Sequence, residues 1–143
     1  MTRTRMVFGT VAAVIIVAIP LAARSCEQAR DTAVEATQEF RTRIGSRAYD
    51  TIVGAAAPEF QKSAAGGDFA KAMDAIRERL GLWQSSETPT SQVFASTSGP
   101  TVTLVYLSQF ERGTATEEFV WRIRGGKPAL AGYRVKSSAL AAR

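Results

Sequence analysis

The spacing of apolar residues changes at Gly81, and this change constrains the fold more than any other feature of the chain. Before Gly81, apolar residues recur every three or four positions, which is the spacing of an amphipathic helix. After Gly81 they alternate with polar residues, as in a strand with one buried face. Helices that precede the strands, instead of alternating with them, predict an α+β fold in which helices cover one face of an antiparallel sheet.

The first helix is expected over residues 26–44. Its apolar residues form one stripe with charged residues away from it, and they are Ala29, Ala33, Ala36, Phe40 and Ile44. Ser25 and Gln28 have the S-x-x-Q spacing of a capping box, so the helix is expected to begin at this point. Gly45 follows the last apolar residue and is expected to end the helix.

A second, shorter helix is expected in the stretch SRAYDTIVG. Tyr49, Ile52 and Val53 would face inward from it. Pro58 interrupts this pattern because proline cannot continue a helix that precedes it. Phe60 is then expected to fill the core from the turn that follows.

The third helix is expected to run from Asp68, as N-cap, to Gly81, which closes it. Its inward residues follow one another at steps of four, three and four positions, and they are Phe69, Met73, Ile76 and Leu80. Paired glycines before Asp68 predict a loop there.

Four strands are expected after the polar loop QSSETPTSQ, over residues 91–98, 101–110, 115–124 and 129–137. Glycine-bearing turns between these segments are typical of an antiparallel meander. In the third strand, Phe119 and Trp121 share one face, and Glu118 points to the other. We therefore expect about three helices packed on a curved four-stranded sheet.

An apolar segment precedes this domain. Arg3 and Arg5 are followed by 17 residues without charge, residues 7–23, which is the arrangement of a secretory signal. As a helix this run would be about 26 Å long, slightly short of the roughly 30 Å hydrocarbon core of a membrane. We interpret residues 1–25 as a signal peptide or membrane anchor and residues 26–143 as one exported, periplasmic domain.

Three outcomes stay open at Cys26, the only cysteine of the chain. The segment 6–23 can remain as an uncleaved anchor. Signal peptidase can cleave before Cys26, because Ala23 and Ser25 place small residues at the required positions. The stretch LAARSC also resembles the lipobox of a bacterial lipoprotein, in which Cys26 would carry the lipid.

The composition excludes several function classes. The chain has no histidine, which rules out serine–histidine and cysteine–histidine catalytic pairs. No cluster of residues has metal-ligand spacing and no motif indicates a cofactor, so neither is expected. Without the three arginines of residues 1–25, the net charge falls from +5 to +2, which argues against nucleic acid as a partner.

Five short motifs occur in an order that resembles a bacterial envelope family, catalogued as domain of unknown function 4019. They are Tyr49-Asp50, Asp68-Phe69, Leu80-Gly81, Phe110 with Gly113, and Gly132-Tyr133, and the likeness covers about residues 30–140. The resemblance implies a cystatin-like cone, also called nuclear-transport-factor-two-like, in which a strongly bent sheet embraces three helices. It implies an envelope location and no particular activity.

A fold of this kind has a cup between sheet and helices, and four aromatic residues are expected to line it: Tyr49, Tyr106, Trp121 and Tyr133. Asp50, Glu117 and Glu118 are the carboxylates considered as an acid or base. Glu118 points away from the cup, and Glu117 is expected to be exposed because a hairpin lies next to it.

These observations predict a non-enzymatic, membrane-tethered binding or accessory domain of the bacterial cell envelope. Its partner would be a small ligand or another envelope protein. One alternative is an enzyme of isomerase or dehydratase type that uses the cup. A second alternative is a structural subunit that forms a homodimer through the open face of the sheet.

Overall fold

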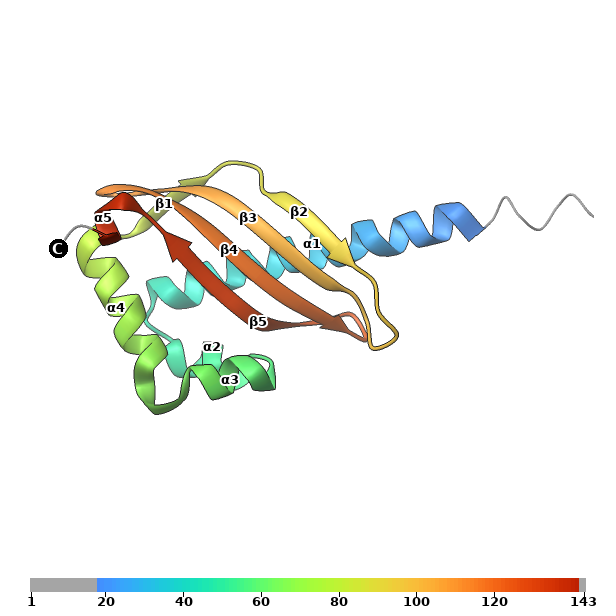
Figure 1. Cartoon of the computed structure of the whole chain (residues 1–143), viewed down its shortest axis with the longest axis horizontal. Helices are drawn as coiled ribbons and strands as arrows, with labels where there is room; N and C mark the ends of the chain where they lie inside the picture. The colour runs from blue at the N-terminus through green and yellow to red at the C-terminus, as the bar shows by residue number, and fades with distance from the viewer. Residues whose placement is uncertain (1–17, 142–143) are drawn as a thin grey trace, which may run out of the picture.

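The computed structural model describes residues 18–141, with side chains from Ala23 onward (Figure 1). The helices are α1 (Ala18–Gly45), α2 (Tyr49–Ala55), α3 (Pro58–Ser63), the 3-10 turn η1 (Ala65–Gly67), α4 (Asp68–Leu80) and α5 (Ser138–Ala141). The strands are β1 (Trp83–Ser86), β2 (Thr90–Phe94), β3 (Thr101–Phe110), β4 (Gly113–Arg124) and β5 (Lys127–Lys136). The predicted α+β class is confirmed.

The sheet is antiparallel throughout and its strand order is β1-β3-β4-β5. β1 and β2 both pair with β3: β1 with the end of β3 near Phe110, and β2 with residues 101–105. They are thus two halves of one interrupted edge strand. The four predicted strands correspond to β2–β5, but the sequence prediction missed β1, most of which lies in the segment expected to be a polar loop.

Helix α1 crosses the inner face of the sheet (Figure 1). The predicted apolar stripe is confirmed, since Ala29, Ala33, Ala36 and Phe40 are buried and Ile44 packs beside them. Three alanines allow the helix to approach the strands closely. The Phe40 ring lies 5.2 Å from that of Phe119, the fully buried residue at the centre of β4.

The predicted start of the first helix is wrong. α1 is already helical at Ala18, so Ser25 and Cys26 lie inside it and Ser25 caps nothing. The side chains of residues 23–28 are exposed, and Ala29 is the first buried one. This part of α1 projects from the body of the domain (Figure 1). Alanine, arginine, glutamate and glutamine favour helix, so nothing in this stretch interrupts it.

The short helices lie below the sheet in Figure 1. Tyr49 and Ile52 of α2 are buried as predicted. Phe60 is also buried as predicted, although it belongs to the helix α3 and not to a turn. The backbone N–H of Ala57 donates to the carbonyl oxygen of Leu130 at 2.9 Å, which attaches the α2–α3 junction to β5.

The predicted end of the third helix is confirmed and its predicted cap is wrong. α4 ends at Leu80, and Gly81 has a φ of 78°, a conformation that glycine adopts without steric cost. At the other end Asp68 is the first helical residue; Gly67 occupies the cap position, and no side chain caps the helix. Gly67 has a φ of 81°, so the paired glycines set the entry of the chain into α4.

Candidate functional site

An ion pair between Arg41 of α1 and Glu117 of β4 lies inside the domain. The distance from Arg41 Nη2 to Glu117 Oε2 is 3.0 Å, and the two side chains are only 6% and 3% exposed. The expectation that Glu117 would be exposed is wrong. Glu117 of β4 is paired with Tyr106 of β3 on one side and with Val135 of β5 on the other. It therefore lies in the interior of the sheet and on its inner face.

Both oxygens of the Glu117 carboxylate accept hydrogen bonds. The Tyr133 hydroxyl donates to Oε1 at 2.8 Å. Ser108 donates to Oε2, beside the Arg41 guanidinium. Ser108 in turn shares a hydrogen bond of 2.6 Å with Ser86 of β1. The network therefore connects α1 to β1, β3, β4 and β5.

The Arg41 guanidinium lies against two aromatic rings. Its Cζ atom is 4.4 Å from the centre of the Trp83 ring and 4.5 Å from that of Tyr106. These are distances at which a cation attracts an aromatic face. Arg41 Nε and Nη1 are buried and have no hydrogen-bond partner among the described residues. Most of the guanidinium's capacity to donate is thus unused.

A cavity of about 210 Å³ adjoins the ion pair, and we call it the central cavity. Its polar lining consists of Arg41, Arg77, Glu117 and Tyr133. Its apolar lining comes from α1, α4 and the β1 and β3 ends, mainly Phe40, Ile44, Met73, Ile76, Leu82, Trp83 and Phe110. Its volume is less than the space that a drug-sized ligand needs.

Two buried tyrosines of this region, Tyr133 and Tyr106, both have a raised pKa. Burial raises the pKa of Tyr133 well above its ordinary value of 10.0, and the negative charge of Glu117 and its hydrogen bond raise it further. Burial also raises the pKa of Tyr106, while the positive charge of Arg41 opposes the rise. At neutral pH, Tyr133 is therefore a hydrogen-bond donor and not a charged group.

The structure does not bring the four predicted aromatic residues to one cavity. Tyr133 lines the central cavity. Tyr106 borders a groove on the other side of Trp83, between α1 and the chain from β1 to β2. Tyr49 borders a separate hollow near η1, and its hydroxyl donates to Asp74 Oδ1 at 2.8 Å.

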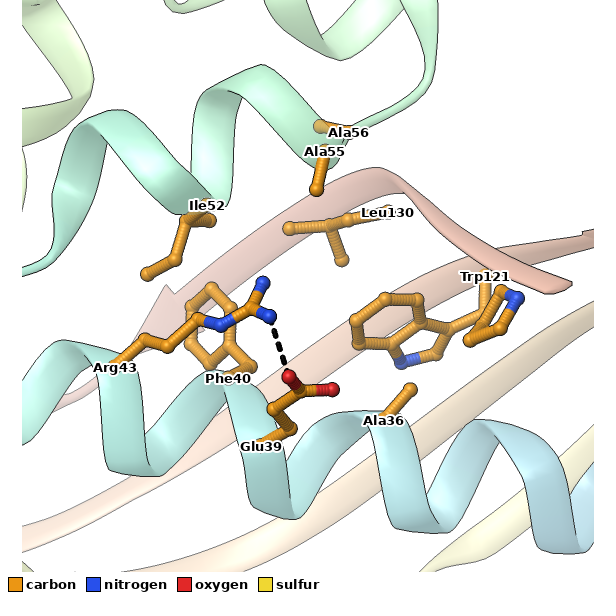
Figure 2. A pocket seen from close by; sticks show the side chains of 10 residues that line it. Ala36, Glu39, Phe40, Arg43, Ile52, Ala55, Ala56, Trp121 and Leu130 are labelled. Carbon is orange, nitrogen blue, oxygen red and sulfur yellow. Dashed lines mark hydrogen bonds and ion pairs between the residues drawn. The ribbon is translucent and has the colours of Figure 1, made fainter.

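Trp121 belongs to a fourth, smaller cavity of about 60 Å³ between α1, α2 and β5 (Figure 2). Figure 2 shows its indole beside Ala36, with side chains of α2 on the opposite side and the Glu39–Arg43 ion pair of α1 nearby. The indole N–H donates to Thr37 Oγ1 at 3.0 Å. Trp121 is thus a core residue with a satisfied polar group.

The sequence prediction missed Arg41 and Arg77 of the central cavity, and Ser108 of the hydrogen-bond network beside it. A signal for Ser108 was present: it has the same strand parity as Leu104 and Tyr106, which face inward. Arg41 lies directly after Phe40, at the border of the apolar stripe. A polar residue at an inward position together with a cation at the edge of a helix stripe indicates a buried polar network.

The remaining predicted residues lie away from the cavity. Asp50 is exposed, and Glu118 is half-buried on β4 and does not line it. Cys26 is an exposed free thiol on α1. Among residues 18–141, no group of three possible ligands could hold a metal ion.

The predicted membrane segment lies mostly outside the described residues, because the apolar run 7–23 largely precedes Ala18. Within the described part of the chain, no helix has the length and apolar character needed to cross a membrane. Comparisons of the chain with protein-family models, curated proteins and solved structures found no match.

Proposed function

We propose that this protein is a non-enzymatic binding domain of the bacterial cell envelope, tethered through its N-terminal segment. The central cavity is its binding site. The observation that carries this proposal is the combination of apolar walls with a buried, hydrogen-bonded ion pair at one side. Apolar walls with a few fixed polar groups are the usual composition of a small-molecule site.

The size of the cavity supports a small ligand. Its volume of about 210 Å³ suits a molecule with one polar end and a short apolar body. Met73, Ile76 and Phe110 would surround the apolar body. The Glu117 network holds α1 to the sheet, and the hydrogen bond from Arg77 to the Gly45 carbonyl oxygen ties α4 to α1, so the walls of the site are in place before the ligand binds.

A neutral probe tests whether the cavity binds small molecules. 1-Hexanol added to the full chain is expected to shift the NMR signals of residues that line the central cavity. Ile76→Trp should abolish these shifts because the larger side chain fills the space. Leu107→Trp is the matched control, since Leu107 is half-exposed and does not line the cavity. If neither 1-hexanol nor a charged probe of the same chain length shifts these signals in the wild-type protein, the proposal is contradicted.

The tether has its own test. Intact-mass spectrometry of the native protein distinguishes the uncleaved chain, a chain that starts at Cys26, and that chain carrying lipid. The first and the third results support a tether. A native chain that begins at or near Cys26 without lipid contradicts it.

The alternative of an isomerase or dehydratase is favoured by one observation, the Glu117 carboxylate and the Tyr133 phenol beside one cavity. Such reactions begin with removal of a proton next to a carbonyl group, for which a carboxylate needs a free lone pair. Glu117 already accepts from Arg41, Ser108 and Tyr133, so three of its roughly four lone-pair sites are occupied, which argues for a structural role. The enzyme would be favoured instead if the wild-type protein catalyses deuterium exchange into hexan-2-one and the Glu117→Gln variant does not.

A further inference from the structure

The buried nitrogen atoms that lack a hydrogen-bond partner belong to two arginines. Within the described residues, these atoms are Nε and Nη1 of Arg41 and Nη1 of Arg77. Both arginines line the central cavity, one from α1 and one from α4. Buried N–H groups without a partner are rare and costly in proteins, and they indicate an acceptor that the protein itself does not supply.

From this we propose that the ligand of the central cavity is a small amphipathic anion, with an oxyanion head and a short apolar tail. A carboxylate and a phosphate ester share the chemistry that arginine recognises, since both offer several acceptor oxygens and negative charge. The inference rests on the proposed function, because it names the class of ligand for the same cavity.

The charges around the cavity favour an anion. Its lining contains the cations Arg41 and Arg77 and one anion, Glu117, so the charged side chains of the lining sum to one positive charge. Glu117 is paired with Arg41 through Nη2. Arg77 is half-buried, and a ligand with a negative charge would balance the excess positive charge of the lining.

Asp74 of α4 and Glu111, which follows β3, both have other partners. Asp74 accepts a hydrogen bond from Tyr49 and lies 4.0 Å from Arg47 Nε. Glu111 accepts one from the backbone N–H of Leu82 at 2.8 Å. Neither of the two lines the cavity. Arg77 itself donates through Nη2 to the Gly45 carbonyl oxygen, which holds its side chain next to the C-terminus of α1.

The volume limits the length of the tail. A volume of about 210 Å³ is smaller than the pocket of a drug-sized ligand, so it favours a short tail. Met73, Ile76 and Phe110 supply the apolar contacts that a short tail needs.

The experiment compares four probes of equal chain length on the full chain: hexanoate, hexyl phosphate, 1-hexanol and hexylammonium. Binding is measured by calorimetry and located by NMR. We expect at least one of the two anions to bind at least tenfold more tightly than 1-hexanol, and hexylammonium not to bind. The anion that binds with the higher affinity identifies the head group.

Two outcomes would contradict the proposal. If 1-hexanol binds in the cavity as tightly as both anions, the proposed anion is wrong but the binding function stands. If no probe binds, both are wrong.

Arg77→Gln tests the role of the arginines without disturbing the Arg41–Glu117 pair. It should weaken anion binding about tenfold and leave 1-hexanol binding unchanged, whereas Arg77→Lys should keep part of the anion affinity. Lys71→Gln is the matched control, because it removes one positive charge from an exposed position on the same helix. Equal effects of Arg77→Gln and Lys71→Gln on hexanoate and hexyl phosphate would overturn the proposal.

Discussion

Helix α1 carries two ion pairs whose surroundings differ completely. Glu39 and Arg43 pair along the helix, with side chains 61% and 31% exposed, beside the small cavity of Figure 2. Arg41, which lies between them in sequence, pairs with Glu117 of β4 in the interior. The first pair joins neighbours on one helix. The second joins segments 76 residues apart and belongs to a network that reaches four strands.

Burial, more than the chemistry of the charged groups, decides how much an ion pair contributes to stability. An exposed pair along a helix contributes about 0.3–0.5 kcal/mol, since water solvates the charges well on their own. Removing one partner of a buried pair costs about 3–5 kcal/mol, because the other charge is left without compensation. The four predictions below test this difference, beginning with the largest effect.

Arg41→Ala should lower the free energy of unfolding by about 3–5 kcal/mol, because it leaves the Glu117 carboxylate buried without its cation. Urea denaturation followed by circular dichroism measures the change. Arg43→Ala on the same helix is the control and should cost less than about 1 kcal/mol. If both variants lose the same free energy of unfolding, the two ion pairs do not differ in their contribution to stability and the prediction is wrong.

Tyr133→Phe should cost about 1.5–3 kcal/mol, the range for a hydrogen bond to a charged group. The substitution removes only the hydroxyl that donates to Glu117 Oε1, and the ring contacts with Phe40 and Phe119 remain. The same denaturation measurement applies. A cost below about 0.5 kcal/mol would show that Glu117 Oε1 finds another donor.

Alkaline pH should destabilise the protein through Tyr133. The pKa of Tyr133 lies well above 10.0 in the folded state, so above pH 10.0 the unfolded chain releases a proton that the folded chain keeps. The stability that the neutral phenol provides is therefore present below pH 10.0 and falls above it, by up to about 1.4 kcal/mol per pH unit. Unfolding at a series of pH values measures this slope. Tyr133→Phe should have a shallower slope than the wild type, and identical slopes would contradict the assignment.

Glu39→Gln should have the smallest effect, about 0.3–0.5 kcal/mol. The loss should shrink further in 1 M salt, which screens exposed charges. Comparing the melting temperature at low and high salt tests this. A salt-independent loss would mean that Glu39 contributes through packing in the cavity of Figure 2 and not through its charge.

The parts of the fold that depend on local spacing were predictable from the sequence. The α1 stripe, the end of α4 at Leu80 and four of the five strands follow from apolar periodicity and glycine positions. The elements that were missed depend on contacts distant in the sequence. β1 is short and mostly polar, and its strand conformation comes from pairing with the far end of β3. Ser25 has the spacing of a cap, but a cap requires that the residues before it are not helical.

The candidate site was predictable only in part, for the same reason. Strand parity placed Glu117 on the inner face, but its exposure depended on how far β4 extends toward the hairpin. The β3–β4 pairing continues to Phe110 and Gly113, which leaves Glu117 well inside the sheet. Nothing in the local sequence of Arg41 indicates its partner. The angle and position at which α1 crosses the sheet determine which helix residue contacts which strand residue.

The continuity of α1 gives the domain a fixed reach. Cys26 and Arg41 lie on one unbroken helix, and the distance between them along its axis is about 22 Å at 1.5 Å per residue. A glycine linker of the same length would be flexible, and the distance between its two ends would vary widely. Because α1 is a helix, an attachment at Cys26 would fix the distance from the attachment point to the central cavity. Only the orientation of the domain about that point would vary.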